Sequence, residues 1–311
     1  MALLTVDLHT HLLEKKVEPE SYWRAVLEKG LDAVAITEHA NHRPEKAYRA
    51  LLAERPTGIG LVPGMELNTS IGHVLALGSD EGIYGEKGLL GKDIPIESAL
   101  EIAGEKEIML SIAHPWGFSY DSAAYILGET RLEKLVLQNR VGVEAFNGMF
   151  GNVGEFFYAS NWVKKPMNFF DFLERSRIGR KTRLDRLGRK GREKLGSKGM
   201  EILERGMKPF GLGEKASFVT AGSDAHGPKK IGTGIMKLEA KERGPAGILE
   251  ALKERKNVKW VGPFVRETES GYEISRAGIQ KAEVLSGIKY AAKSALLKKV
   301  SRKGNRAKMK A

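Results

Sequence analysis

The chain has 311 residues and a formal net charge of +12 at pH 7, and it contains no cysteine. Disulfide bonds and thiolate metal sites are therefore excluded, so any metal ion would be held by nitrogen and oxygen ligands. The first residues carry no basic leader, and no apolar run approaches the roughly 18 residues that a membrane span needs, which predicts a cytoplasmic protein with no membrane partner.

Short apolar runs alternate with amphipathic segments along most of the chain, which predicts parallel β-strands joined by α-helices. Strands are expected at 3–8, 31–37, 58–63, 74–77, 108–113, 141–146, 217–221, 235–238 and 258–261. Helices are expected at 18–27, 44–54, 95–104 and 246–253. At this length, one barrel-sized domain with appendages fits the pattern better than several small domains.

The positive charge is concentrated in two segments. Residues 164–208 hold 15 Lys and Arg against 6 Asp and Glu, and residues 281–311 hold 10 against 1, which leaves −6 for the remainder. The first segment is rich in Gly, and we interpret it as an inserted, partly flexible excursion with some helix. Both segments could bind nucleic acid through counterion release or be ordinary solvated basic surfaces.

The second basic segment also has a helical apolar period. Apolar residues recur every four positions, at Val284, Ile288, Ala292, Leu296 and Val300, with lysines on the other face. This period predicts an amphipathic helix, for which packing on the body of the protein is favoured over packing on a membrane. The last ten residues are expected to be disordered.

Imidazole and carboxylate side chains recur where the predicted strands end. The motifs are Asp7-Leu-His9-Thr-His11, Glu38-His39, Glu66 with His73, His114-Pro115 and Asp224-Ala-His226. Residues two apart in a strand project to the same face, so His9 and His11 could chelate one ion together. One buried histidine is usually part of the core, but six that are interleaved with carboxylates predict a site for more than one divalent metal ion.

These motifs resemble, in their order along the chain, those of the PHP (polymerase and histidinol phosphatase) family. The resemblance is carried by Asp7-Leu-His-Thr-His11, Ala35-Ile-Thr-Glu-His39, Pro63-Gly-Met-Glu66, Gly72-His-Val-Leu75, Ala113-His-Pro115 and Gly222-Ser-Asp-Ala-His226. It implies a distorted seven-stranded (β/α) barrel with two to three divalent metal ions, which could be Zn, Mn or Fe, and phosphoesterase activity. The barrel domain is expected over 1–262, including the basic insertion, with a basic helical extension over 263–311.

The resemblance also implies roles for individual residues. The first ion would be bound by His9, His11, Glu66 and Asp224, the second by Glu66, His73 and His114, and the third by His39 and His226. Glu66 would therefore bridge two ions. The catalytic residues that the resemblance implies are Glu66, Asp224 and His226.

The chain departs from the family's pattern in two motifs. The loop Leu12-Leu-Glu-Lys-Lys16 is shorter than in the family and lacks the usual third-ion ligand, so Glu14 is the expected substitute, with Glu18 as the alternative. Glu38 stands where Asp is usual, and we expect this exchange to affect only the orientation of the ligands.

Other residues are candidates for walls of the site or for substrate binding. We interpret Glu144, three residues before Asn147, as a wall or a support of the ligands. Arg43 and Lys229 suit phosphate oxygens by their charge. His42 could contact phosphate or donate a proton, or it could be an ordinary exposed loop residue.

The sequence thus predicts a metal-dependent phosphoesterase that hydrolyses a phosphate ester through a metal-bridging hydroxide. The basic segments favour a nucleotide or oligonucleotide substrate, whereas the metal site alone would equally suit a histidinol-phosphate-like small molecule. A non-catalytic nucleic-acid-binding scaffold on the same barrel is the alternative from another class. Hydrolysis of a non-phosphate bond at a similar site is a further alternative.

Overall fold

The computed structural model describes residues 1–118, 120–150, 164–176, 180, 184–255, 259–261, 265–268 and 271–274. The amphipathic helix expected near the C-terminus and the disordered end lie outside these residues. Among the described helices, none is both long and apolar enough to cross a membrane.

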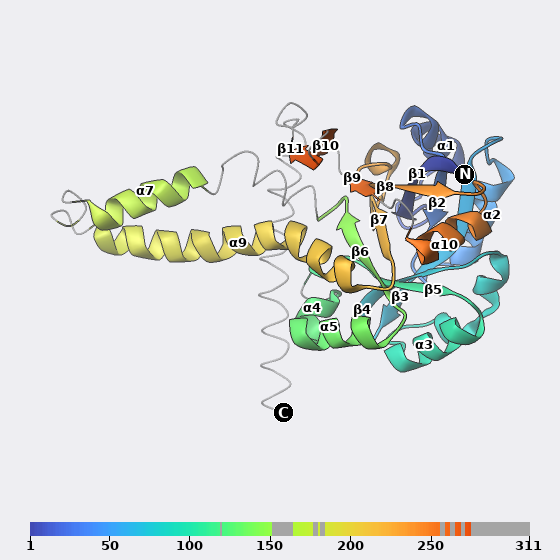
Figure 1. Ribbon diagram of the computed structural model, residues 1–311, viewed down its shortest axis with the longest axis horizontal. Coiled ribbons are helices and arrows are strands. Elements are labelled where there is room, and N and C mark those ends of the chain that lie inside the picture. Colours follow the sequence, from blue (N-terminus) through green and yellow to red (C-terminus); the bar gives the residue numbers. More distant parts are fainter. Residues whose placement is uncertain are drawn as a thin grey trace.

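A nine-stranded sheet forms the centre of the fold (Figure 1). Its strands are β1 (Ala2–Thr10), β2 (Ala33–Ile36), β3 (Gly60–Thr69), β4 (Gly72–Leu77), β5 (Met109–Ile112), β6 (Gly142–Asn147), β7 (Val219–Gly222), β8 (Ile235–Ala240) and β9 (Lys259–Val261). The strand order is β7-β6-β5-β4-β3-β2-β1-β8-β9, so β1 to β7 follow one another around the sheet.

The segment after β7 returns to the end of β1 and closes these strands into a ring. The backbone N–H of Asp224 donates to the carbonyl of His9 over 2.8 Å, and the N–H of His11 donates to the carbonyl of Ala225 over 2.9 Å. The predicted (β/α) barrel is therefore confirmed, with β8 and β9 as additional strands beyond the seven of the ring.

Strand β4 runs against both of its neighbours, whereas the other neighbouring pairs within β1–β3 and β5–β7 are parallel. The reversal places the first residues of β4 beside the last residues of β3 and β5. His73 pairs with Asn68 of β3, and its carbonyl accepts a hydrogen bond from the N–H of Ala113 over 3.1 Å. A side chain at the beginning of β4 thus reaches the end of the barrel at which the parallel strands finish.

Helices cover the outside of the barrel. They are α1 (Pro19–Glu28), α2 (Pro44–Ala53), α3 (Ile96–Glu105), α4 (Ala123–Ile126), α5 (Glu129–Gln138) and α10 (Pro245–Glu254), with short 3-10 turns η1 (Glu81–Gly85), η2 (Lys87–Leu89) and η3 (Pro228–Lys230). Three of the helices begin with proline, which suits the first turn because its N–H has no partner there. The expected helices are present, and α4 and α5 are additional.

The alternation of side chains between the two faces of β1 explains how a polar site can lie next to an apolar core. Leu4, Val6 and Leu8 are buried in an apolar cluster that includes residues of β8 and α10. Because side chains alternate along a strand, the intervening Asp7 and His9 project from the opposite face. One strand therefore contributes to both the core and the site.

The basic insertion is more helical than we expected. It contains α7 (Lys164–Arg175) and the 31-residue α9 (Asp185–Lys215), and we call these two helices the helical arm. In Figure 1, α7 and the first part of α9 lie side by side and project away from the barrel. A Cβ atom at Gly188 would lie 2.6 Å from the backbone N of Glu174 and 2.7 Å from the carbonyl oxygen of Phe170. Gly188 therefore allows the two helices to approach closely.

The last part of α9 fastens the helical arm to the barrel. Lys208 and Lys215 form ion pairs of 2.6 Å with Glu129 and Glu133 of α5. The guanidinium of Arg255 donates to the carbonyls near the end of α9, at 2.8 and 2.9 Å. Beyond the barrel, the structure also describes a hairpin of β10 (Val265–Thr268) and β11 (Gly271–Ile274), where the sequence predicted only a helical extension.

Candidate metal centre

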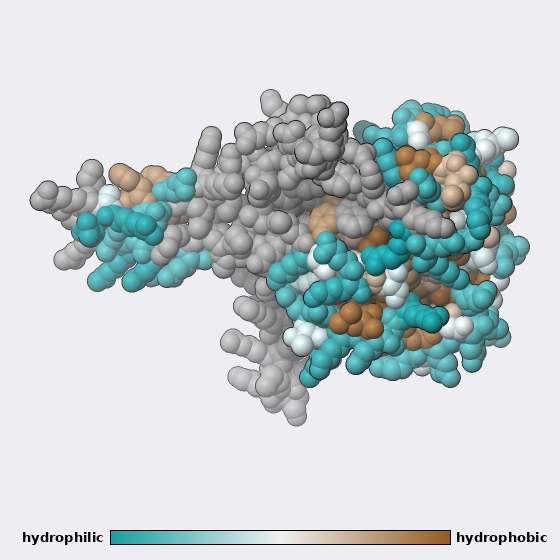
Figure 2. Space-filling model, viewed as in Figure 1, coloured by the Kyte–Doolittle hydropathy of each residue, from teal (hydrophilic) through white to brown (hydrophobic). Residues whose placement is uncertain are grey.

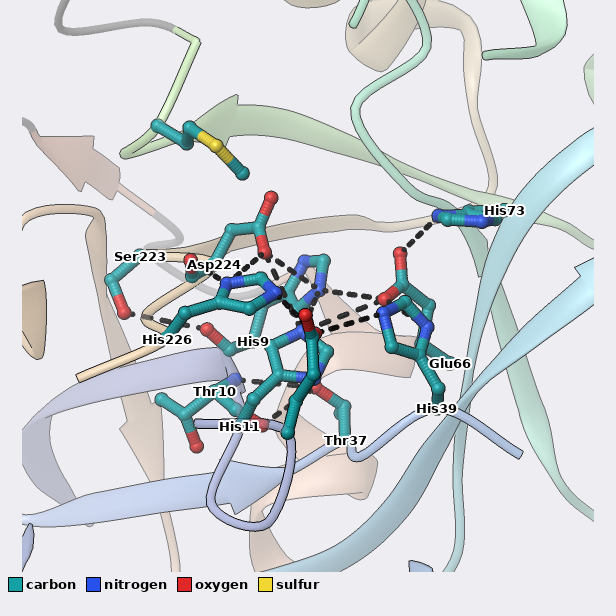
Figure 3. Close-up of polar contacts among 12 residues, drawn as sticks. His9, Thr10, His11, Thr37, His39, Glu66, His73, Ser223, Asp224 and His226 are labelled. Carbon is teal, nitrogen blue, oxygen red and sulfur yellow. Dashed lines mark hydrogen bonds and ion pairs between the residues drawn. The ribbon is translucent and has the colours of Figure 1, made fainter. Parts of the chain in front are cut away.

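The histidines and carboxylates of the sequence motifs converge at one end of the barrel (Figure 3). They come from the end of β1 (His9, His11), the segment after β2 (His39), β3 (Glu66), the beginning of β4 (His73), the segment after β5 (His114) and the segment after β7 (Asp224, His226). Most of these side chains are buried, including His9, Glu66 and Asp224. Chain topology, not sequence proximity, brings them together.

The first group combines two imidazoles with two carboxylates. The Nε2 atoms of His9 and His11 lie 3.2 Å apart, and each faces one oxygen of Glu66 and one oxygen of Asp224 over 3.4–3.7 Å. The ligand atoms of His9, His11 and Glu66 all lie within 4.8 Å of one another, close enough for one ion to contact all three. The spacing thus fits a divalent ion.

Glu66 presents its two oxygens to different sets of imidazoles. Oε2 belongs to the first group, while Oε1 lies 2.8 Å from Nδ1 of His73 and 3.0 Å from Nε2 of His114. The second group therefore shares this carboxylate with the first. This is the geometry that a carboxylate needs to bridge two ions.

A third group surrounds Glu14. Its Oε2 lies 2.8 Å from Nε2 of His226 and 3.5 Å from Nε2 of His39. These imidazoles hold the pKa of the Glu14 carboxyl far below its usual range. Glu18, the alternative from the sequence, is exposed at the start of α1.

An unsatisfied hydrogen-bond acceptor in the third group also suits a bound cation. Oε2 of Glu14 is buried, yet within the described part of the chain it has no hydrogen bond of suitable geometry. Nδ1 of His226 lies 3.0 Å from the carbonyl oxygen of Asp224, which can only accept, so Nδ1 carries a proton and Nε2 is the ring nitrogen that faces Glu14. In the neutral imidazole, the lone pair of Nε2 and the carboxylate oxygen would both be available to one cation.

Further carboxylates hold the histidines in place. Oε1 of Glu144 lies 2.9 Å from Nδ1 of His9, and its Oε2 accepts hydrogen bonds from the N–H of His114 and from Nδ2 of Asn147, at 2.7 and 3.0 Å. Oε1 of Glu38 lies 3.6 Å from Nδ1 of His11. The outward nitrogen of His9 thus has a hydrogen-bond partner, whereas Nδ1 of His11 and Oε1 of Glu38 have none among the described residues. In both rings the other nitrogen faces the centre.

Asp7 has a different role from its neighbours in the motif. Its carboxylate accepts hydrogen bonds from the backbone N–H groups of Ser223 and Gly232, at 2.8 and 2.9 Å. Burial raises its pKa to about 6, although these hydrogen bonds oppose the shift. Asp7 thus ties β1 to the segments on either side of Asp224 and His226 and does not face the three groups directly.

Two of the residues in the centre have a strained backbone. His114 has a φ of 26° and Asp224 a φ of 51°, values that are uncommon for residues other than glycine. Both residues follow the end of a buried strand, and both backbones are held by the hydrogen bonds described above. The strain is confined to positions that turn a side chain into the centre.

The electrostatics of the cluster favour positive charge. Burial alone would lower the pKa values of His11 and His114, but the neighbouring carboxylates outweigh it and raise both to about 9. Burial would raise the pKa of Glu66, but His73 and the other imidazoles hold it well below its ordinary value. The carboxylates can be balanced either by protons on the imidazoles or by bound cations.

The predicted substrate contacts lie at the rim or apart from the cluster. His42 is exposed, and its ring centroid is 6.5 Å from that of His39. Arg43 and Lys229 are also exposed, and neither forms an ion pair with the cluster in the region that the structure describes. Glu144, which the sequence suggested as a wall or a support of the ligands, contacts Nδ1 of His9 and the backbone N–H of His114.

Comparisons with known proteins support the resemblance that the motifs carry. Residues 218–257 match a family model described as PHP-associated. No curated protein matches the chain in sequence. The family resemblance is thus confirmed by this match together with the barrel and the order of its motifs.

Solved structures are similar to the chain at low sequence identity. The lesion-specific endonuclease Q of Pyrococcus furiosus has a TM-score of 0.50 and 15% identity, over 86% of this chain and 61% of that one. PsfC of Pseudomonas syringae PB-5123 has a TM-score of 0.49 and 15% identity, over 94% of this chain and 99% of that one. The chain thus spans less than two thirds of the endonuclease, and the likeness to that endonuclease shows a common fold.

Proposed function

We propose that this PHP-family chain is a metal-dependent phosphoesterase that hydrolyses a phosphate ester of a nucleotide or oligonucleotide. The observation that carries the proposal is the position of Glu66, whose two oxygens face different groups of imidazoles. A purely structural carboxylate would need one such set of partners. Two sets joined by one carboxylate are what a pair of adjacent cations needs.

The three groups define which residues would hold the ions. The first ion would be held by His9, His11, Glu66 and Asp224, the second by Glu66, His73 and His114, and the third by Glu14, His39 and His226. Imidazole and carboxylate ligands suit Zn, Mn and Fe. The third group is complete only because Glu14 occupies the position between His39 and His226.

Divalent ions in this arrangement would supply Lewis acidity towards a phosphoryl group and would activate water. The chain's own residues orient the histidine ligands and exclude bulk water. Glu144 fixes the ring of His9, the charge of Glu38 lies 3.6 Å from the ring of His11, and burial of Glu66 keeps bulk water from the shared carboxylate. The half-exposed side of the cluster, where His39, His73 and His226 lie, is the side from which a substrate can enter.

The helical arm supports a polyanionic substrate. Its exposed basic side chains include Arg175, Arg186, Arg189 and Lys190, and Arg180 between the two helices is exposed as well. In Figure 2, hydrophilic residues line one side of its outer end and apolar residues line the other. Exposed phosphate-binding cations attract nucleic acid by counterion release. The basic segment 281–311 would act in the same way, and the related fold of a lesion-specific endonuclease agrees with such a substrate.

The test is a panel of phosphate esters assayed with the full chain after removal and return of Mn or Zn. We expect metal-dependent hydrolysis of nucleotide or oligonucleotide esters, and loss of that activity in Glu66→Gln. A purified Glu54→Gln variant, altered at an exposed carboxylate next to the end of α2, is the control and should behave as wild type. Hydrolysis of histidinol phosphate alone would instead favour a small-molecule phosphatase, and metal binding without any hydrolysis would favour a scaffold.

A further inference from the structure

A large aromatic side chain is exposed beside the metal centre without a role in it. Tyr120 lies in the loop between His114 and α4, and 52% of its surface is exposed. Phe118 stacks on one face of its ring, with centroids 5.4 Å apart and planes inclined by 10°. Tyr120 makes no side-chain hydrogen bond to any other described residue, so polar anchoring does not explain its place.

A row of rings connects Tyr120 to the centre. Phe118 packs edge-on against Phe150, and the ring of Phe150 lies next to that of His114, with centroid distances of 5.2 Å for both pairs. With the 5.4 Å step from Phe118 to Tyr120, the exposed ring is no more than about 16 Å from the imidazole of His114. Because this path follows three ring contacts, it is an upper bound on the separation, which the base of a nucleotide whose own phosphate lies in the centre can span.

The loop below Tyr120 is fastened to the same histidines. The carbonyl of Asp121 accepts the N–H of His73 over 2.8 Å, and Oγ of Ser122 lies 3.4 Å from Nδ1 of His114. Ser122 also donates to Asp121 over 2.9 Å. The position of Tyr120 relative to the proposed second ion is therefore set by the backbone, before any ligand binds.

We propose that Tyr120 is a stacking platform for a nucleobase of the substrate, with Phe118 as its support. This inference rests on the proposed function, because it assigns the nucleoside of an ester whose phosphate lies in the metal centre. A flat uncharged ring stacks on any base, so the platform would accept different sequences. A small ester without a base would leave the platform unused.

If Tyr120 had only a structural role, its replacement would affect the binding of ligands with and without a base alike. Phe118 and Phe150 are almost fully buried and form the packed part of the row, whereas Tyr120 adds one ring at its exposed end. Loss of a packing residue would weaken binding of every ligand of the centre or lower the metal content. Loss of a platform would weaken only ligands that carry a base.

The experiment compares two probes with the full, metal-loaded chain, 2-aminopurine deoxyribonucleoside 5′-monophosphate and deoxyribose 5-phosphate. Stacking of 2-aminopurine on Tyr120 should quench its fluorescence. Tyr120→Ala should raise the Kd of the 2-aminopurine nucleotide about 5-fold or more, in line with the effect of removing a stacked aromatic side chain. The affinity for deoxyribose 5-phosphate should not change, and Tyr120→Phe and Tyr120→Trp should bind the nucleotide as wild type does.

Leu137→Ala, which removes another exposed apolar side chain, is the matched control and should leave both affinities unchanged. If Tyr120→Ala lowers the metal content, Tyr120→Leu takes its place, since it keeps an apolar contact with Phe118. Equal weakening of both probes, or no quenching by the wild-type chain, would overturn the platform. Quenching without hydrolysis of any ester would count against the phosphoesterase alone.

Discussion

The buried carboxylate of Glu144 lies 2.9 Å from Nδ1 of His9, on the side of the ring that faces away from the centre. This contact fixes the proton on Nδ1 and leaves the lone pair of Nε2 for a cation. Because the same carboxylate accepts the N–H of His114, it aligns a residue of the first group with one of the second.

We therefore expect Glu144→Gln to weaken metal binding about 10- to 100-fold, the usual effect of removing such a support. Titration of the metal-free variant with Mn or Zn, followed by calorimetry, measures this loss. Glu133→Gln, at a half-buried carboxylate of α5, is the control. An unchanged affinity in Glu144→Gln would mean that His9 does not depend on this partner.

Replacing Glu66 should cost far more activity than replacing His39. Glu66→Gln removes charge shared by the first and second groups, so we expect kcat/KM to fall more than about 100-fold. His39→Ala removes a ligand of the third group, where Glu14 and His226 remain, and a 3.0 Å contact with Oε2 of Glu66, but it leaves the shared carboxylate in place. The comparison requires circular dichroism to show that both variants are folded. Similar losses would indicate that the third group is as important as the shared carboxylate.

The stability of the metal-free chain should fall as the pH rises. The pKa values of His11 and His114 are raised from 6.5 to about 9, so their protonation stabilises the folded state fully below pH 6.5. That contribution is lost as the pH rises through about 9. We expect the Tm of the metal-free chain to fall over this range, and the gain in Tm on adding Mn to grow, because ions replace the protons. A gain in Tm that shrinks with rising pH would contradict this linkage.

Gly222 should be intolerant of any side chain. A Cβ atom at this position would overlap the backbone and Cβ of His9. Gly222→Ala should therefore cost about 1–3 kcal/mol in the free energy of unfolding, measured with urea, and should weaken metal binding. Gly104→Ala is the matched control, since a Cβ there meets nothing within 4 Å, and in helix α3 it should stabilise by about 1 kcal/mol. Equal stability of the two variants would show that the contact with His9 can relax.

The exposed cations of the helical arm should control the salt dependence of oligonucleotide binding. For the triple variant Arg186→Ala/Arg189→Ala/Lys190→Ala, we expect a shallower slope of log Kd against log salt, by about one for each lost phosphate contact. Turnover of a small phosphate ester should barely change, because these residues are remote from the centre. Lys46→Ala on α2 is the control, and an unchanged slope in the triple variant would remove the arm from the interface.

Much of the barrel could be predicted from the sequence because alternation and motif order are local signals. The strands at 31–37 and 108–113, for example, were expected within a few residues of β2 and β5. The direction of β4 was not anticipated, although only Ser70 and Ile71 separate it from β3, which permits a hairpin and no crossover helix.

The helical arm could not be predicted from residue preference. Its glycines disfavour an isolated helix, but in the folded chain Gly188 and Gly191 face α7, so tertiary packing outweighs intrinsic propensity. The geometry of the third group could not be predicted from spacing either. The sequence made Glu14 the expected ligand and left Glu18 as the alternative, and the path of the loop after β1 brings Glu14 to within 2.8 Å of His226.

The backbone hydrogen bonds that join β1 to the segment after β7, which we call the seam, bear on the order in which the parts of the metal centre form. His9 and His11 lie on one side of the seam, and Asp224 and His226 lie on the other, at opposite ends of the barrel sequence. In contrast, Glu66 and His73 belong to one hairpin and can meet early in folding, because little chain separates them. The first ion would thus bind only after the two ends of the barrel sequence have met, and separation of β1 from the segment after β7 would release it.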